Sequence, residues 1–409
     1  LIPPAWRQDS KLNKIRTIKI MKLCAISFKE CWQDEQGRWW AQGGFPGQMT
    51  AIGRLLDRMT LVIVRGEPQE GGSPLPDFAE VVPLRPIPGS DTRRKVALLR
   101  AFPYYWGRIW REVRAADVVH TPVPGDLSLL GALAALLQRK RLIMRYGGSW
   151  EENSQQTTMN RVTKWIMRRF AGGRNVMIAT GMQTELPAPR MHWLFATALA
   201  RAEIDQFQPD YERGLSRPPC LVTLGRLSPE KGVEVLVRAV GLLKEEGFEP
   251  MPVLTILGDG PERGRLEALV DELGLRGQVR FTGMLGREEL HRELAGADLA
   301  VHPSLTESLS KAWLDAMAHG LPLIATRVGV AGEFFGPPGQ VGWLVPAGDP
   351  EALADAMRQV LTGEVDWPGM RRRCREKVEG MTLEAWAGRI GRFCAEQWGM
   401  RLEKGKLVV

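Results

Sequence analysis

Cysteine is scarce in this 409-residue chain, and its distribution excludes two kinds of cross-linked site. The five cysteines are scattered, odd in number and never spaced as Cys-x-x-Cys, which argues against a disulfide framework and against a zinc site. They are Cys24, Cys31, Cys220, Cys374 and Cys394. This usage favours a reducing, cytoplasmic location.

Long apolar runs are also absent. The longest, Leu127–Leu137, has 11 residues, whereas a membrane-spanning helix needs about 20. The apolar stretch Ile20–Phe28 is interrupted by Lys29 and Glu30, so it is too short for a secretory signal. The sequence therefore predicts neither a transmembrane helix nor a secreted protein.

The net charge of +8 is concentrated in the first half of the chain. Residues 1–200 carry 29 Lys and Arg against 16 Asp and Glu, a net +13, and the remainder carries 26 against 31, a net −5. Residues 1–20 contribute +4 and show no strong periodicity, so we expect a poorly ordered leader. The asymmetry indicates an anionic partner, either a membrane surface or an acidic molecule. Nucleic acid is disfavoured because no recognition motif accompanies the charge.

Short aliphatic runs alternate with longer amphipathic stretches, a rhythm typical of βα units around parallel sheets. Prolines and glycine in residues 206–219 interrupt it and predict a linker. We therefore expect an α/β protein with two doubly wound domains, 21–205 and 220–382, and a helix over 383–409 that packs back toward the first domain. The expected strands are Lys22–Ser27, Leu61–Arg65, Asp117–His120, Arg141–Tyr146, Val176–Thr180, Leu221–Gly225, Val253–Gly258, Val279–Thr282, Leu299–Pro303 and Pro322–Thr326.

Two cations follow the strand expected at Leu221–Gly225. Arg226 and Lys231 stand in the loop before the next helix. In a doubly wound sheet ligands bind beyond the carboxyl ends of the strands, so this pair predicts an anion site suited to a diphosphate. A solvated surface loop is the alternative.

Two glycines follow the next strand. Gly258 and Gly260 either let the backbone approach a ligand closely or form a tight turn. Their spacing does not meet Gly-x-Gly-x-x-Gly, so a dinucleotide fingerprint is not indicated.

The most specific segment runs from Val301 to Pro322. A strand ends at Pro303, a polar loop follows, and a helix is expected from about Ser308, with its free N–H groups facing the crevice. On such a helix Glu307 and Asp315 would lie about 12 Å apart along the axis, about 80° apart in azimuth. They could then hold the two ends of a polyol-phosphate ligand. A capped helix with one exposed acid is the alternative.

The second half resembles the donor-binding domain of retaining GT-B glycosyltransferases, specifically glycosyltransferase family 4 (glycosyl transferases group 1). The first half resembles the family more loosely, through Gly43-Gly44 and the strand that ends at His120. The likeness of the second half covers roughly Leu221–Leu361, and its ordered motifs are Gly225-Arg226-Leu227, Lys231-Gly232, Gly258-Asp259-Gly260-Pro261, Val279–Gly283, Pro303-Ser304, Gly320-Leu321-Pro322, Ala325-Thr326, Gly332-Glu333, Gly342–Val345 and Gly348-Asp349.

This resemblance implies a GT-B fold, in which two Rossmann-like domains face a central cleft, and a role for each matched residue. The first domain would bind the acceptor and the second the nucleotide sugar. Arg226 and Lys231 would neutralise the donor diphosphate, and Glu307 would hold hydroxyls of the transferred sugar. Asp315 would bind the ribose hydroxyls. The remaining implied donor contacts are Gly43, Gly44, Gly258, Gly260, Ser308, Leu309, Ser310 and the loop at Arg280–Gly283 beside the base.

Three positions depart from the family pattern. Asp315 stands where the family has Glu and is one methylene shorter. Ser308-Leu309-Ser310 stands where the family has Gly-Phe-Gly, so a Ser310 hydroxyl would replace an N–H contact with phosphate.

The third departure concerns the acceptor side of the cleft. The strand expected over Arg141–Tyr146 ends in Arg145-Tyr146, where the family often has His-Gly. This leaves Arg145, Tyr146 and His120 as acceptor-side candidates, and His120 is equally explained as a structural strand-end histidine.

The chain lacks the motifs of several other enzyme classes. No Asp-x-Asp triplet, Gly-x-Ser-x-Gly elbow or Walker loop occurs. The resemblance therefore implies a retaining hexosyl transfer without metal or cofactor, from a UDP-, GDP- or ADP-sugar to a hydroxyl acceptor. Its catalytic residues would be Glu307, Lys231 and Arg226. The alternatives are an inactive GT-B nucleotide-binding protein and a nucleotide-sugar epimerase.

The basic first half contains two stretches that mix aromatics with cations, Trp106–Arg111 and Arg161–Phe170. Interfacial helices have this composition, which would suit a lipid-linked or acidic acceptor and a peripheral position on the inner face of a membrane. The second stretch equally forms a core stripe at helical spacing. That stripe consists of Met159, Val162, Ile166, Met167 and Phe170.

Overall fold

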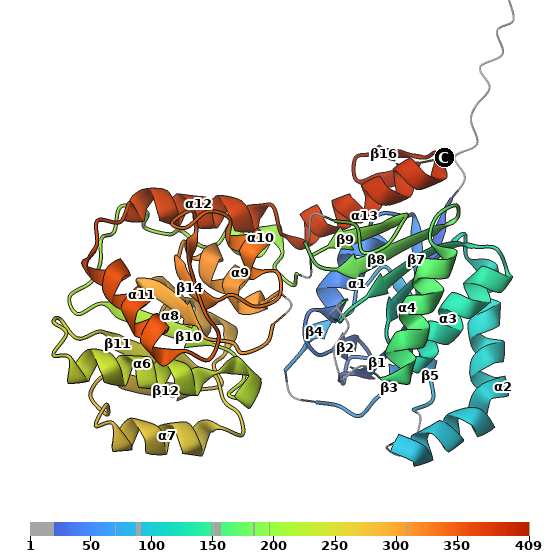
Figure 1. Cartoon of the computed structure of the whole chain (residues 1–409). Helices are drawn as coiled ribbons and strands as arrows, with labels where there is room; N and C mark the ends of the chain where they lie inside the picture. The colour runs from blue at the N-terminus through green and yellow to red at the C-terminus, as the bar shows by residue number, and fades with distance from the viewer. Residues whose placement is uncertain are drawn as a thin grey trace, which may run out of the picture.

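The chain folds into two α/β units that stand side by side (Figure 1), each built on its own sheet. The computed structural model describes residues 20–69, 71–86, 91–148, 150, 157–182, 185–195, 197–307 and 309–408. Of the expected leader it thus describes only Ile20. Within the described residues, none of the helices combines the length and apolar character required to cross a membrane.

The N-terminal unit has a nine-stranded sheet whose main part is parallel, in the order β5-β3-β1-β6-β7-β8-β9. Two short antiparallel strands, β2 and β4, extend from β1. The strands are β1 Lys22–Gln33, β2 Trp39–Ala41, β3 Arg58–Arg65, β4 Ser73–Pro74, β5 Ala79–Leu84, β6 Val118–Val123, β7 Arg141–Tyr146, β8 Asn175–Thr180 and β9 Met191–Leu194. The helices are α1 Phe45–Gly53, α2 Asp91–Ala115, α3 Asp126–Leu137, α4 Thr158–Phe170 and α5 Arg201–Ile204.

The C-terminal unit has a six-stranded parallel sheet in the order β12-β11-β10-β13-β14-β15. Its strands are β10 Cys220–Leu224, β11 Val253–Leu257, β12 Val279–Gly283, β13 Leu299–His302, β14 Leu323–Thr326 and β15 Gly342–Val345. Its helices are the 3-10 turn η1 Pro229–Lys231, then α6 Val233–Glu245, α7 Arg263–Glu272, α8 Arg287–Gly296, α9 Lys311–Ala318, α10 Ala331–Phe335, α11 Pro350–Thr362 and α12 Trp367–Glu379. Numbered in chain order this is 3-2-1-4-5-6, the order of dinucleotide-binding sheets.

That strand order places a crevice at one point of the C-terminal sheet. The chain leaves β10 toward β11 on one side, and β13 begins the other side, so the connections diverge beyond the carboxyl ends of β10 and β13. Ligands of doubly wound sheets bind at such a switch point. The strands hold it rigidly because they are buried apolar runs, with Leu221, Val301 and Ile324 almost inaccessible to solvent.

The last helix returns to the first unit. α13, Leu383–Trp398, packs on α1 and on β8 and β9. Trp386 is fully buried there, and Phe393 stacks on His192 with ring centroids 4.1 Å apart. The expected helix over 383–409 is wrong beyond Trp398, because Gly399 takes a left-handed conformation (φ 63°) and ends it. A hairpin follows, β16 Arg401–Glu403 and β17 Lys406–Val408.

All ten expected strands are present, with bounds that differ by a few residues at most ends. β2, β4, β5, β9 and β15 were not expected, since they are short or lie at sheet edges and carry little apolar alternation. The expected start of α9 near Ser308 is wrong because Ser310 is still extended and the helix begins at Lys311.

The core stripe expected on α4 is only partly correct. Ile166 and Met167 are buried, but Val162 and Phe170 are 43% and 38% exposed, and Trp165 is 61% exposed. α4 therefore buries one narrow face and presents apolar side chains among cations on its outer face.

Candidate active site

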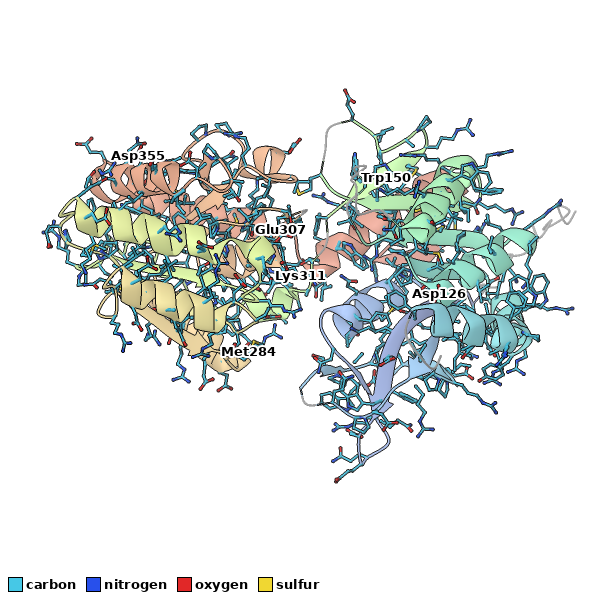
Figure 2. The ribbon with its side chains drawn as sticks, turned by 60° about the horizontal axis from the view of Figure 1, so that its bottom comes forward. Asp126, Trp150, Met284, Glu307, Lys311 and Asp355 are labelled. Atoms are coloured by element: carbon cyan, nitrogen blue, oxygen red, sulfur yellow. The ribbon has the colours of Figure 1, made fainter. Side chains whose placement is uncertain are left out.

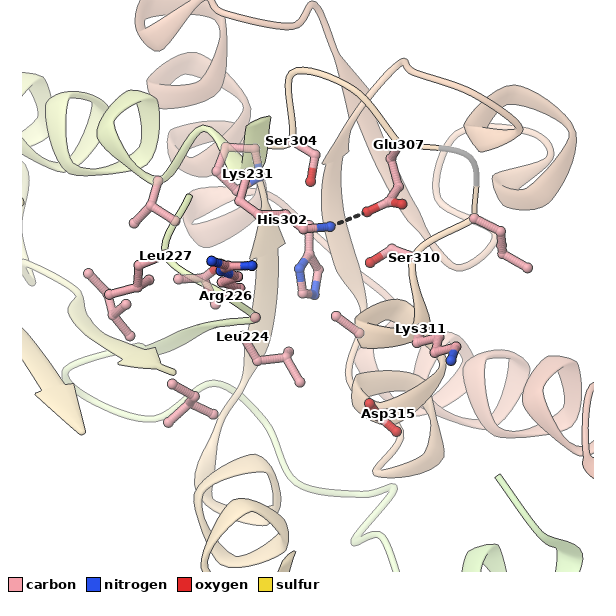
Figure 3. Close-up of a pocket in the computed structure, with 18 residues that line it drawn as sticks. Leu224, Arg226, Leu227, Lys231, His302, Ser304, Glu307, Ser310, Lys311 and Asp315 are labelled. Atoms are coloured by element: carbon pink, nitrogen blue, oxygen red, sulfur yellow. Dashed lines mark hydrogen bonds and ion pairs between the residues drawn. The ribbon is translucent and has the colours of Figure 1, made fainter. Parts of the chain in front are cut away.

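A cavity of about 410 Å³ lies at the carboxyl ends of β10 and β13 (Figure 3). The loop after β10 supplies Arg226 and Lys231, and the segment between β13 and α9 supplies Glu307. The first turns of α9 supply Ser310 and Asp315. The structure thus brings together, around one cavity, the charged residues that the sequence singled out in separate segments.

Lys231 and Glu307 form an ion pair across this cavity. Lys231 Nζ donates to Glu307 Oε2 at 2.5 Å, with the side chains 30% and 14% exposed. Lys231 is held by the left-handed Gly232 (φ 62°), where a Cβ would stand 2.2 Å from the carbonyl oxygen of Pro303. The loop after β10 therefore rests directly on the end of β13, and this contact places the cation opposite the carboxylate.

The positive end of α9 faces the same space. Ser310 is its N-cap residue but its hydroxyl makes no capping hydrogen bond, so the first N–H groups of the helix keep no side-chain partner from that residue. Glu307 lies outside the helix, so the expected helical spacing between Glu307 and Asp315 was wrong. Ser308, an expected donor contact, lies outside the described residues, and Leu309 is buried beside the cavity.

Asp315 has the most perturbed carboxyl of the site. Desolvation raises its pKa to about 6, against the opposing attraction of Arg287 and Lys311. It is therefore mostly ionised at pH 7, in a place where the charge is poorly hydrated and a ligand hydroxyl would be a favourable partner.

His302 lines the cavity beside these charges and was not expected from the sequence. It is buried, and desolvation together with Lys231 lowers its pKa to about 3, so it is a neutral imidazole. Its Nε2 has no hydrogen-bond partner among the described residues. Its position next to Pro303, at the end of the strand expected over Leu299–Pro303, was the only available signal.

A second, largely apolar cavity of about 560 Å³ adjoins the first. The two share Leu224, Gly225, Arg226 and Leu257, so the exposed Arg226 stands at their junction. The rest of the lining is Gly258, Asp259, Gly260, Met284, Leu285 and Leu290. Together the cavities form one elongated site with Arg226 between its two parts.

Close packing explains why glycine occupies two positions in the lining of this second cavity. A Cβ on Gly258 (φ 139°) would stand 2.0 Å from the carbonyl oxygen of Gly225, and one on Gly260 would stand 2.3 Å from that of Leu227. Both glycines thus permit the loops after β10 and β11 to touch, and they also line the cavity.

Arg280 lies apart from this site. Its guanidinium donates to Thr255 Oγ1 at 3.2 Å and to Glu293 Oε2 at 2.6 Å, and its side chain lines neither cavity. Of the expected loop at Arg280–Gly283, the end at Gly283 meets Gly258 in a backbone bridge.

Two of the three acceptor-side candidates are core residues. His120 is fully buried, its Nδ1 lies 3.2 Å from the Ile143 carbonyl oxygen, and burial lowers its pKa to about 3. Tyr146 is 2% exposed and packs edge-on against Trp150. Neither offers a surface to an acceptor, which corrects the expectation for both.

Arg145 is held differently. It donates to Gln48 Oε1 at 2.9 Å and lies 5.4 Å over the ring of Trp386.

Gly43 is left-handed (φ 72°) and precedes Gly44, the N-cap of α1. A Cβ on Gly44 would lie 3.6 Å from Lys311 Nζ, so the glycine loop of the N-terminal unit faces the start of α9.

Comparisons with known proteins agree with this geometry. Residues 210–381 match the family Glycosyl transferases group 1. The alpha-D-kanosaminyltransferase of Streptomyces kanamyceticus is 29% identical over 328 residues, which cover 73% of this chain and 82% of that protein. A GDP-mannose-dependent alpha-(1-6)-phosphatidylinositol monomannoside mannosyltransferase of Mycolicibacterium smegmatis is 29% identical over 66% of this chain and 74% of its own length.

Solved structures show the fold. The crystal structure of Anabaena Alr3699/HepE in complex with UDP has a TM-score of 0.67 at 18% identity and covers 92% of this chain and 100% of that chain. WaaG, a glycosyltransferase involved in lipopolysaccharide biosynthesis, has a TM-score of 0.59 over 91% of this chain and 99% of its own. The protein therefore has the GT-B fold. Its residues 210–381 are similar to the glycosyl transferases of group 1.

The raised pKa of Asp315 generates a test of the site's electrostatics. Because the folded-state pKa lies above the ordinary value of 3.8, this carboxyl costs stability as pH rises from about 4 to about 6. Asp315→Asn should therefore increase the free energy of unfolding at pH 7 by at most about 3 kcal/mol and raise the melting temperature accordingly. At pH 4 it should have little effect on either quantity. The exposed Asp355→Asn is the control. Equal effects at both pH values would contradict the assigned desolvation.

Proposed function

We propose that the protein is a retaining glycosyltransferase that moves a hexosyl unit from a nucleotide-diphosphate sugar to a hydroxyl acceptor without a metal ion. In this proposal residues 21–205 bind the acceptor and residues 220–382 bind the donor. The observation that carries it is the convergence of Arg226, Lys231 and the amino end of α9 on one cavity at the switch point of a GT-B sheet.

The chemistry follows from where charge develops. When the glycosidic bond breaks, the leaving diphosphate gains negative charge, and fixed cations and helix N–H groups stabilise that charge without reorganising. Arg226 and Lys231 are these cations. The incoming hydroxyl attacks from the same face, and an oxygen of the leaving phosphate accepts its proton, so no protein base is assigned.

The sugar, the ribose and the base of the donor would each contact a different part of the elongated site. Glu307, oriented by Lys231, holds hydroxyls of the transferred sugar, and Asp315 holds those of the ribose. The apolar cavity at Met284 and Leu285 receives the nucleobase. The nucleotide of the donor can be UDP, GDP or ADP. UDP is named in the HepE complex, and GDP is named in the mycobacterial relative.

A thermal-shift screen against UDP-, GDP- and ADP-sugars tests this function. One nucleotide series should raise the melting temperature, since a ligand at 100 times its dissociation constant adds about 2.7 kcal/mol to the free energy of unfolding. The intact sugar should stabilise at least as much as its nucleoside diphosphate, because Glu307 adds contacts. Absence of a shift with all three series would contradict the proposal.

Two alternatives share the donor site and differ in turnover. An inactive GT-B protein is motivated by Asp315 and by the altered segment before α9, and an epimerase would change the donor sugar with no acceptor present. Incubation of the stabilising donor without acceptor separates them. Slow release of nucleoside diphosphate supports the transferase, tight binding without turnover supports the inactive protein, and a converted sugar supports the epimerase.

The ion pair across the cavity predicts the phenotype of two variants. Lys231→Ala and Glu307→Ala should each lower turnover by more than about tenfold, because each removes a charge that contacts the reacting donor. Their melting temperatures should stay near that of the wild type, since both side chains lie at a cavity wall.

The matched control for these variants is Arg238→Ala, which breaks an ion pair of 2.9 Å with Glu234 on the exposed face of α6. It should leave turnover unchanged. Turnover of wild-type rate in Lys231→Ala or Glu307→Ala would remove that residue from the mechanism.

We also propose reversible contact of the N-terminal unit with a membrane surface, which would present a lipid-linked or acidic acceptor to a cytoplasmic enzyme. The outer face of α4 supports it, because the exposed Val162, Trp165 and Phe170 stand among Arg161 and Arg169. Aromatic side chains bordered by cations suit an anionic interface.

Co-sedimentation with vesicles measures this contact. Vesicles of phosphatidylglycerol should bind the protein at low salt and release it at high salt, while phosphatidylcholine vesicles should not bind it. Trp165→Ser should weaken binding without changing the melting temperature, as the side chain is 61% exposed. Absence of binding at low salt would end this part of the proposal.

A further inference from the structure

Lys311 is a cation at the donor cavity that the sequence did not single out. It is the first residue of α9, it lines the cavity, and its side chain is exposed. Figure 3 shows that side chain directed away from Lys231 and Glu307. Figure 2 shows Lys311 on the side of the C-terminal unit that faces the N-terminal unit. Its Nζ is the atom that a Cβ on Gly44 would approach to 3.6 Å.

Two cations of the N-terminal unit lie within electrostatic reach of it. Arg145 is the last but one residue of β7 and is 8% exposed, and its Nε has no hydrogen-bond partner among the described residues. Lys29 lies in β1 at the irregularity between Ile26 and Glu30, where the register with β3 shifts, and is half-buried. Desolvation lowers the pKa of Lys311, and repulsion from Arg145 and Lys29 lowers it further.

Asp315 lies one turn after Lys311 on α9, and its attraction opposes the lowering of the Lys311 pKa. Its own pKa is raised by desolvation. Like charges gathered in a cleft repel one another and raise the local potential, which an anionic ligand would offset. Arg145 in addition has an unused, buried donor, which is costly unless a ligand or water completes it.

The position of these cations separates them from the donor diphosphate. The donor already has Arg226 and Lys231 on its own unit. Lys29 and Arg145 belong to the opposite unit, and both act electrostatically on Lys311. Arg145 donates to Gln48 of α1, and Lys311 of α9 faces Gly44, the N-cap of that same helix. An anion held by all three would therefore lie on the acceptor side of the cavity.

We propose that Lys29, Arg145 and Lys311 form a binding site for an anionic group of the acceptor, a phosphate or a carboxylate, held between the two units. This inference rests on the proposed function and narrows it, because a neutral acceptor would leave the three cations uncompensated. The site orients the acceptor hydroxyl toward the donor sugar, and its residues are positioning residues.

Calorimetric titration with inorganic phosphate and with glycerol 3-phosphate tests the site. The donor cavity is first saturated with the nucleoside diphosphate that the thermal-shift screen selects, so that phosphate cannot occupy it. Wild-type protein should bind both probes saturably. Lys29→Gln and Lys311→Gln should each weaken binding by about tenfold or more, the usual effect of removing one charged hydrogen-bond partner.

Lys22→Gln is the matched control, because Lys22 is exposed at the opposite end of β1 from Lys29. It should leave phosphate affinity unchanged. Phosphatidylcholine vesicles with and without phosphatidic acid form a second arm, and binding of either the soluble or the lipid phosphate through Lys29 and Lys311 supports the site.

Two results would overturn the proposal. One is the absence of saturable binding of phosphate in either arm. The other is a loss of nucleotide affinity in Lys29→Gln as large as its loss of phosphate affinity, which would assign the cations to the donor. Donor hydrolysis without acceptor keeps the two proposals apart, because a protein that hydrolyses donor but does not bind phosphate contradicts only the anion site.

Discussion

Close backbone contact between the loops that follow β10, β11 and β13 determines where the charged groups of the cavity lie. A Cβ at Gly258 would stand 2.0 Å from the Gly225 carbonyl oxygen, and one at Gly232 would stand 2.2 Å from that of Pro303. With glycine at both positions the three strand ends meet without side chains between them. This contact positions Lys231 against Glu307, and it positions Arg226 at the junction of the two cavities.

The proposed binding sites depend on where individual charged side chains lie, and the net charges of the two halves of the chain do not indicate those positions. The half with a net charge of −5 contains the cations proposed to hold a diphosphate, together with the positive end of α9. The basic half contributes Lys29 and Arg145 to the opposite wall and an exposed cationic face on α4. The proposed donor and acceptor sites are thus both electropositive, and Lys311 stands between them.

Much of this arrangement could be predicted from the sequence, for physical reasons. Buried parallel strands are continuous apolar runs, so all ten expected strands were recognisable, and strand ends located Arg226, Lys231 and Glu307. The start of α9 was predicted too early, because the polar segment that precedes the helix does not determine at which residue the helix begins. Lys311 was overlooked because its importance comes from Gly44 and Arg145, which are distant in sequence. The burial of His120 and Tyr146 likewise depends on packing that no local pattern encodes.

A crystal structure of the protein with the nucleotide sugar that stabilises it most tests the central claim directly. The account predicts the diphosphate between Arg226, Lys231 and the amino end of α9, with the sugar hydroxyls on Glu307 and the base in the apolar cavity at Met284. A diphosphate bound away from Arg226 and Lys231, with Glu307 still paired only to Lys231, would contradict it.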